Sequence, residues 1–170
     1  AASALPGFGA EHARVMEALP YLARALVVIH DRTRGTMNEA GAIDYALIPA
    51  DVERLRAGIV GAASCYLNAG AEEVILPING TSPIRREAEL AAVLKMALRP
   101  SDFANLYAVH LFGGAAMGGG APDGACDERG AVMGVRGLYI VDAAGLPSAT
   151  GVNPQITIMA NALRIAAGLG

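Results

Sequence analysis

Apolar and polar residues alternate in two runs within the first fifty positions. Residues 21–31 (YLARALVVIHD) place Leu26 and Val28 on one face, and residues 43–48 (IDYALI) alternate in the same way. A period of two is typical of a β-strand that is buried on one side. The link between the runs is too short for a crossover helix, so the pattern predicts an antiparallel hairpin in which residues 27–31 pair with residues 43–48.

The period then changes to that of an α-helix. Apolar residues recur at spacings of three and four through residues 52–66, which defines one helix face. Asp51 is expected to cap the start of this helix. Gly70 is expected to end it in the left-handed conformation.

A further strand and a second helix complete the first hundred residues. Residues 73–78 (EVILPI) are expected to form the strand. Ser82 and Pro83 are expected to open the helix, which continues through EAELAAVLKMAL and stops before Pro100. Strands interrupted by two helices predict an α+β fold, in which the helices pack on one face of an antiparallel sheet.

The last third of the chain has a different pattern, because short apolar segments alternate with glycines. Residues 104–112 form an apolar segment, and residues 113–124 form a glycine-rich loop. Residues 132–133 and 138–141 are expected to be short strands around a Gly-Val-Arg-Gly turn. A helix is predicted from about residue 154 to residue 169, and its apolar stripe is made of Ile156, Met159, Ala160 and Leu163.

Composition excludes several classes of protein. Hydrophobic residues make up 54% of the 170 and charged residues only 17%, yet no apolar run reaches the length of a transmembrane helix. A net charge of −3 offers no basic surface for nucleic acid. The two cysteines, Cys65 and Cys126, have neither the number for a disulfide framework nor a metal-ligand spacing. No targeting signal is recognised, so a cytoplasmic protein is expected.

Three features of the last third carry polar groups suited to chemistry. His110 lies in an apolar run, Asp142 follows four apolar strand residues, and Asn153-Pro154 precedes a long apolar helix. Each also has an ordinary structural interpretation: a satisfied histidine, a turn-forming acid, and a helix cap followed by a first-turn proline. Oxidation of an alcohol needs a base for the hydroxyl proton, which a histidine can supply, and a hydride acceptor, which no side chain can supply.

Taken in order, these features form a recognisable series of motifs: HLFG, MG, GLYIVDA and GVNPQ. They occupy residues 110–113, 117–118, 137–143 and 151–155. The series resembles the C-terminal signature of the glucose–methanol–choline (GMC) family of FAD-dependent alcohol oxidoreductases, and most closely its long-chain fatty alcohol oxidase and dehydrogenase branch. The stretch ALVVIHDRTRG and the alternating run after it resemble the antiparallel substrate-domain sheet of that family more loosely.

The resemblance implies a role for each of these residues. His110 would be the catalytic base, and Asn153 would hydrogen-bond the oxygen of a hydrophobic alcohol substrate. The N-terminus of the last helix, at Asn153, Pro154 and Gln155, would face the flavin of FAD, where its free N–H groups stabilise negative charge. Asp142 and Ala143 would contact the ribityl and pyrophosphate part of FAD.

The same resemblance divides the chain by function. Residues 1–109 would be part of a substrate-binding domain. Residues 110–170 would be an active-site and FAD-contacting segment whose strand and helix complete an FAD-binding domain. A sterol or a polyol stays open as the substrate, as does the electron acceptor.

The chain departs from the family pattern in two places. Gly114-Ala115-Ala116 replaces the Ser-Cys-Arg or Thr-Cys-Arg of the fatty alcohol branch. A strand followed by G-x-G-x-x-G is also missing, since Gly7-Phe8-Gly9 has no third glycine and no preceding strand. We therefore expect FAD not to bind stably to this chain alone, and an N-terminal FAD-binding half or subunit to be its partner. The alternative is a non-catalytic, degenerate or partner-binding module.

Overall fold

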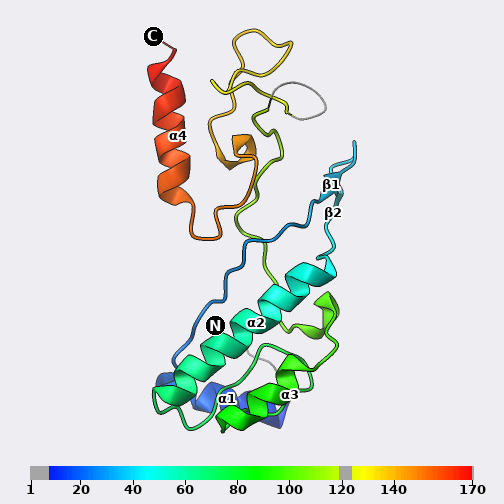
Figure 1. Ribbon diagram of the computed structural model, residues 1–170, viewed down its shortest axis with the longest axis vertical. Helices are drawn as coiled ribbons and strands as arrows, with labels where there is room; N and C mark the ends of the chain where they lie inside the picture. The colour runs from blue at the N-terminus through cyan, green and yellow to red at the C-terminus, as the bar shows by residue number, and fades with distance from the viewer. Residues whose placement is uncertain (1–7, 119–123, 170) are drawn as a thin grey trace. The chain divides into compact units, whose positions relative to one another are not determined.

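The structure is a computed structural model that describes residues 8–118 and 124–169 (Figure 1). The chain divides into two compact units, Ala1–Tyr107 and Ala108–Gly170, which are described separately below. The start of the chain with Gly7, and residues 119–123 of the expected glycine-rich loop, lie outside the described residues. This structural division is distinct from the predicted functional division into residues 1–109 and 110–170, which stays a prediction.

The first unit is mainly helical. Its order is α1 (Ala10–Glu17), η2 (Leu19–Tyr21), β1 (Thr36–Met37), β2 (Ile43–Asp44), α2 (Pro49–Asn68), η3 (Glu87–Glu89), α3 (Leu90–Leu94) and η4 (Pro100–Asp102). The η elements are single 3-10 turns. The longest helix, α2, lies beside α3 (Figure 1).

One hydrophobic cluster lies along α2. The buried face of this helix has the spacing predicted for it, and Gly70 has a φ of 93°, so the predicted left-handed end is confirmed. The segments after the helix supply the opposite side of the cluster. Its buried members are Val52, Leu55, Ile59, Ala63, Leu76, Ile78, Ile84, Leu90, Val93 and Phe103.

The predicted cap of α2 was wrong. The helix begins at Pro49, its N-cap is Ile48, and no side chain caps it. Asp51 is instead fully buried within the first turn, where its carboxylate accepts hydrogen bonds from Thr33 and Arg32. Proline is favoured at the first helical position because its missing N–H would have no partner there, which explains the earlier start.

The predicted hairpin is present with a different first strand. β1 and β2 pair antiparallel, with Thr36 opposite Asp44 and Met37 opposite Ile43. Residues 22–35 contain no strand, so the predicted pairing of residues 27–31 was wrong. Val27 and Ile29 pack against the α2 cluster, and side-chain burial on a helix therefore takes the place of a strand ladder there.

Two further segments of the first unit differ from prediction. Residues 73–78 form isolated bridges at Val74 and Ile78 instead of a continuous strand. Ile84 exchanges two main-chain hydrogen bonds with Val74, at 2.8 and 2.9 Å, so the chain after Ser82 stays extended. This pairing explains why the second helix does not open at Ser82 and Pro83.

The second unit has less regular structure. It contains η5 (Ala143–Gly145) and α4 (Gln155–Ala167), and the predicted C-terminal helix is thereby confirmed. The two predicted short strands occur as an antiparallel bridge between Ala131 and Tyr139, around the expected glycine-containing turn. The apolar segment 104–112 forms no strand.

The predicted apolar stripe of α4 is exposed. Ile156, Met159 and Leu163 are 77%, 50% and 72% exposed, and the buried side chain of α4 is Ile165. The described part of the chain therefore combines helices with a small two-stranded antiparallel sheet, which replaces the larger sheet that the alternating runs predicted.

Candidate active site

The segment that carries His110 has no regular secondary structure, and the His110 side chain is exposed. Gly113, three residues later, has a φ of 74°, which glycine adopts without strain. Main-chain hydrogen bonds then attach the loop to the η5 turn: Ala115 N–H donates to Ala144 at 3.0 Å, and Met117 N–H donates to Gly145 at 2.8 Å. The histidine motif and the Asp142 motif, about thirty residues apart, are thus held together through their backbones.

Asp142 acts as the cap of η5. Its Oδ1 accepts a hydrogen bond from the Ala144 N–H at 2.9 Å, and the side chain is exposed. Ala143 is half-buried and accepts a hydrogen bond from the Leu146 N–H at 3.1 Å. One carboxylate oxygen of Asp142 therefore has the ordinary role of a turn-forming acid. Because the side chain is exposed, the other oxygen is open to solvent.

Asn153 does not cap α4. The N-cap is Pro154, which is buried, and the helix has no side-chain cap. The first helical hydrogen bond runs from Ile158 N–H to the Pro154 carbonyl at 2.9 Å. Within the described residues, the N–H groups of Gln155 and Ile156 have no acceptor, and the exposed Asn153 side chain has no partner. This helix end therefore presents free donors and a free amide.

A buried cysteine, which the sequence analysis did not identify, supports the loop that follows His110. Cys126 has no exposed surface, and its Sγ donates to the Ala115 carbonyl at 3.3 Å. Burial, and to a smaller extent the charge of Asp127, raise the pKa of this thiol. The residue follows a run of glycine, proline and aspartate, a composition that predicts an exposed loop, so its burial could not be recognised from the sequence.

Arg164 ties the last helix to the same region. Its guanidinium donates to the Glu128 carbonyl at 2.7 Å and to Asn161 Oδ1 at 2.9 Å. Below it, Ile165 packs so closely on Gly130 that a Cβ at Gly130 would lie 2.8 Å from Ile165 Cδ1. The orientation of α4 relative to the loop around Cys126 therefore depends on contacts near its C-terminal end.

His110 and Asn153 both belong to the second unit and are both exposed. Within the described residues, no hydrogen bond joins the two side chains. That the two side chains face one cavity stays a prediction.

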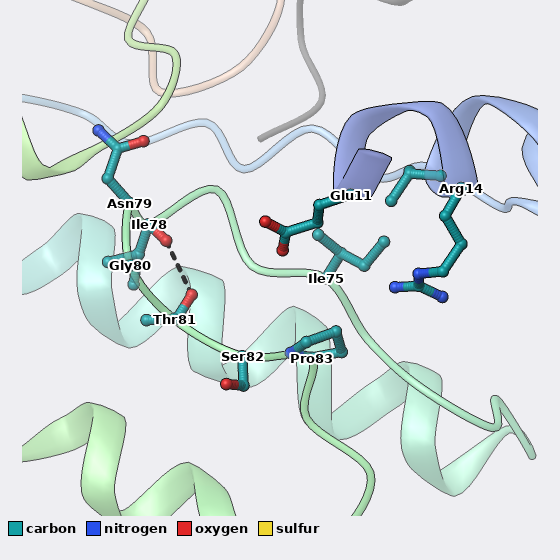
Figure 2. Close-up of a pocket in the computed structure, with 10 residues that line it drawn as sticks. Glu11, Arg14, Ile75, Ile78, Asn79, Gly80, Thr81, Ser82 and Pro83 are labelled. Carbon is teal, nitrogen blue, oxygen red and sulfur yellow. Dashed lines mark hydrogen bonds between the residues drawn. The ribbon is translucent and has the colours of Figure 1, made fainter. Parts of the chain in front are cut away.

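Two surface cavities lie elsewhere. The first, of about 290 Å³, lies in the first unit, where Glu11 points from α1 toward the loop that carries Gly80 and Thr81 (Figure 2). Thr81 Oγ1 donates to the Ile78 carbonyl at 2.8 Å and thereby stiffens this loop. The second lies in the second unit beside Arg129 and Arg164. Neither contains a predicted site residue.

Metal sites and membrane-spanning helices were also sought among the described residues. No group of three or more His, Cys, Asp or Glu side chains is placed to hold a metal ion. None of the described helices combines the length and apolar character needed to cross a membrane. The candidate site consists of an exposed histidine, a capped acidic turn and a helix N-terminus without a side-chain cap.

Comparison with known proteins identifies the family. The family model described as GMC oxidoreductase matches residues 30–162, which is more than half of the chain. The chain belongs to the GMC oxidoreductase family. No solved structure gives a significant match.

Named relatives agree with this assignment. An uncharacterized GMC-type oxidoreductase of Mycobacterium tuberculosis is 35% identical over 164 residues, which are 95% of this chain and 26% of the relative. A long-chain-alcohol oxidase of Arabidopsis thaliana, FAO4B, is 30% identical over 151 residues, covering 82% of this chain and 20% of that protein. The chain thus spans about a quarter or less of the length of these relatives.

Proposed function

We propose that this chain supplies the substrate-binding and base-bearing part of an FAD-dependent oxidoreductase that oxidises the CH–OH group of a hydrophobic alcohol. The observation that carries the proposal is the N-terminus of α4. Asn153 is a residue type that commonly caps a helix and Pro154 one that commonly opens it, yet no side chain caps α4, and the Asn153 amide stays free. Free donors at a helix start suit a ligand that bears or develops negative charge.

The donor set fits FAD on this side of the molecule. The N–H groups of Gln155 and Ile156, beside the buried Pro154, would hydrogen-bond the edge of the flavin ring. Asp142 and Ala143, at the η5 turn, would contact the ribityl and pyrophosphate part. When bound, FAD supplies the hydride acceptor that no side chain can provide. Most remaining contacts would come from an FAD-binding half or subunit, so this chain alone is not expected to retain FAD.

His110 would remove the hydroxyl proton of the alcohol. Histidine suits this task because it changes charge within the physiological pH range. Its loop is held by the main-chain bonds of Ala115 and Met117 to the η5 turn, which fix the segment without using the imidazole. Asn153 would donate a hydrogen bond to the same substrate oxygen and so orient its carbon for hydride loss.

A hydrophobic primary alcohol is the proposed substrate class. The Arabidopsis relative FAO4B is a long-chain-alcohol oxidase. Each methylene that the site buries contributes about 0.8 kcal/mol. The completed enzyme should therefore act on 1-dodecanol with a far higher kcat/KM than on ethanol, and equal values for the two alcohols would contradict the proposed substrate class.

The test of the base is a substitution in the active, FAD-loaded enzyme that contains these residues. His110→Ala should lower kcat on 1-dodecanol by roughly a hundredfold or more. The control is His12→Ala, which removes a histidine from α1 and should leave kcat unchanged. A His110→Ala enzyme with the wild-type rate would refute the assignment.

The non-catalytic module stays the second candidate, because Gly114-Ala115-Ala116 lacks the arginine of the fatty alcohol branch. A visible absorption spectrum separates the two. Under the enzyme proposal, the purified chain is colourless, and a stoichiometric flavin spectrum is recovered only with an FAD-binding partner. A chain that never forms a flavin-containing assembly would favour the second candidate.

A further inference from the structure

The chain contains a single Asn-Gly pair, Asn79-Gly80, which forms an exposed turn of the first unit. Asparagine followed by glycine is prone to deamidation, because a residue without a Cβ leaves its main-chain nitrogen open to the carboxamide before it. The reaction needs water, an accessible carboxamide and a following main-chain nitrogen that no hydrogen bond holds.

The turn is closed by hydrogen bonds that do not use Gly80. Thr81 donates twice to the Ile78 carbonyl, through its N–H at 3.3 Å and its Oγ1 at 2.8 Å. The Asn79 N–H donates to the Asp102 carbonyl at 2.7 Å. Among the residues that the structure describes, the Gly80 N–H has no acceptor. No hydrogen bond therefore has to break before this nitrogen can react.

The carboxamide and the space around it are open. Asn79 and Gly80 are both exposed, and apart from the chain neighbours no atom lies within 4 Å of the position that a Cβ would take on Gly80. The Asn79 side chain makes one long hydrogen bond, from Nδ2 to the Ser101 carbonyl at 3.5 Å. Water can therefore reach a carboxamide that is only weakly held.

Asn68, at the end of α2, provides a contrast within the same chain. It is exposed as well, and its Nδ2 donates to the Ser64 carbonyl at 2.9 Å. The residue after it, Ala69, has a Cβ, and its N–H donates to the Cys65 carbonyl at 3.0 Å. Both asparagines are open to water, but the nitrogen that would attack is bonded after Asn68 and free after Asn79.

We propose that Asn79 is a site of spontaneous deamidation in the folded chain. The Gly80 nitrogen loses its proton and forms a bond to Asn79 Cγ, while the bond from Cγ to Nδ2 breaks and ammonia leaves. A five-membered succinimide ring remains. Water then adds to either carbonyl of the ring and opens it to aspartate or isoaspartate. The proposal does not depend on which reaction the enzyme performs.

The product adds a carboxylate to the cavity of the first unit. Asn79 and Glu11 both line this cavity (Figure 2). Arg14 lines it too, but its guanidinium is already paired with Glu73 at 3.2 Å. Each conversion makes the chain one charge more negative than its net charge of −3. An acidic form of the chain should therefore accumulate with time and separate on an anion-exchange column.

Peptide mapping by mass spectrometry tests this assignment, because trypsin releases Asn68 and Asn79 in one peptide, residues 57–85. The 170-residue chain is incubated at mildly alkaline pH, folded in buffer and unfolded in guanidinium chloride. The readout is the mass gain from replacement of the side-chain NH₂, followed at each asparagine. Folding should slow the conversion of Asn79 less than about threefold and that of Asn68 at least about tenfold, because a hydrogen-bonded helical amide must first open.

Three outcomes would contradict the proposal. An Asn79 that gains no mass in the folded chain would not be a modification site. Equal slowing of the two asparagines on folding would mean that the turn is closed to the reaction. Equal conversion of Asn68 in the folded and unfolded samples would mean that the bond from Ala69 does not protect, and that the free Gly80 nitrogen is not the cause.

A pair of variants adds a check on the chemistry. Asn79→Gln keeps a carboxamide but needs a six-membered ring, in which the attack is less favourably placed, and should lower the mass gain at this position at least about tenfold. Ser82→Ala changes an exposed neighbour, keeps both reacting residues and should retain the wild-type rate. An undiminished mass gain of the peptide in Asn79→Gln would place the modification at another residue and refute the assignment.

Discussion

The two units of this chain bury their apolar side chains to very different degrees. In the described residues 8–107, ten apolar side chains form one buried cluster around α2. In the described part of residues 108–170, the buried apolar side chains are Cys126 and Ile165, and the other buried positions are Gly130, Gly145 and Pro154. The candidate catalytic residues lie in the unit with less buried apolar surface.

The difference shows two ways in which the chain fixes its structure. The first unit gains stability from burial of a helix face, which is cooperative and depends on side-chain volume. The second depends more on main-chain hydrogen bonds such as those from Ala115 and Met117, and on close contacts at glycine. Regions with few buried apolar contacts open more easily, so the second unit should be the less stable of the two in isolation.

The largest expected effect is at Asp51. Asp51→Ala removes a fully buried carboxylate that accepts four hydrogen bonds, and leaves the N–H groups of Arg32 and Thr33 without that acceptor. We expect the free energy of unfolding to fall by about 4 kcal/mol, measured by urea denaturation. Asp44→Ala, at an exposed position of β2, is the control and should change it by less than about 0.5 kcal/mol.

The same carboxylate makes the first unit sensitive to acid. Burial alone would raise the pKa of Asp51, but hydrogen bonds from Thr33 and Arg32 and the charge of Arg54 outweigh it, so the pKa is lowered. A lowered pKa stabilises the folded state above the unfolded value of about 4, and this contribution is lost as pH falls through the folded pKa. If Asp51→Ala and the wild type lost stability equally below about pH 4, the hydrogen bonds of the Asp51 carboxylate would not be the cause.

Two isoleucines test the comparison of the units directly. Ile59 on α2 is 4% exposed and Ile156 on α4 is 77% exposed. Ile59→Ala should cost about 3 kcal/mol, from lost burial and the cavity left behind, whereas Ile156→Ala should cost less than about 0.5 kcal/mol in this chain. Thermal denaturation of both variants measures this. Similar costs at the two sites would show that the α4 stripe is buried in solution.

The elements that the sequence predicted well are those with a strong local signal. The apolar face of α2, the left-handed Gly70 and the extent of α4 within one or two residues all follow from spacing and from glycine. The partners of residues 27–31 could not be predicted, because alternation shows that one face is buried and does not show what covers it. Val27 packs on a helix, and the pattern for that is the same as for packing on a sheet.

For the candidate site, the motifs indicated which segments carry it and which family they belong to. The structure added the hydrogen-bond partners of the individual residues, which motif spacing does not predict. Asp51, which lies outside the site in the first unit, shows the same limit: it has the residue type of a helix cap, but it accepts hydrogen bonds from residues 18 and 19 positions away. Asn153 has the residue type of a cap and is free of that role. Long-range hydrogen bonds of this kind leave no periodic pattern, so Cys126 and Arg164 could not be recognised either.

A smaller effect is expected from two glycines of α2. Alanine in place of a helical glycine normally adds up to about 1 kcal/mol of stability. At Gly61 no atom lies within 4 Å of the new Cβ, so Gly61→Ala should realise most of this gain. At Gly58 the new Cβ would lie 2.6 Å from Val27, so Gly58→Ala should instead cost about 1 kcal/mol. A stabilised Gly58→Ala variant would mean that residues 26–29 do not lie against α2.

The smallest effect concerns Asp31. Its pKa is shifted in the opposite direction from that of Asp51, whose negative charge acts on it. Burial, and next the negative charge of Asp51, raise the pKa of Asp31. A raised pKa means that the ionised carboxylate destabilises the folded state at neutral pH, and that this penalty disappears as pH falls through the folded pKa toward about 4. Asp31→Asn should therefore give a small gain in unfolding free energy at pH 7, and the gain should shrink to nothing by pH 4.

Because Asp51 begins to lose its contribution only below that pH, urea denaturation of the two single variants at pH 7, 5 and 3 separates the two carboxylates. A gain that stayed constant from pH 7 to pH 3 would show that it comes from packing of the asparagine and not from removal of a charge.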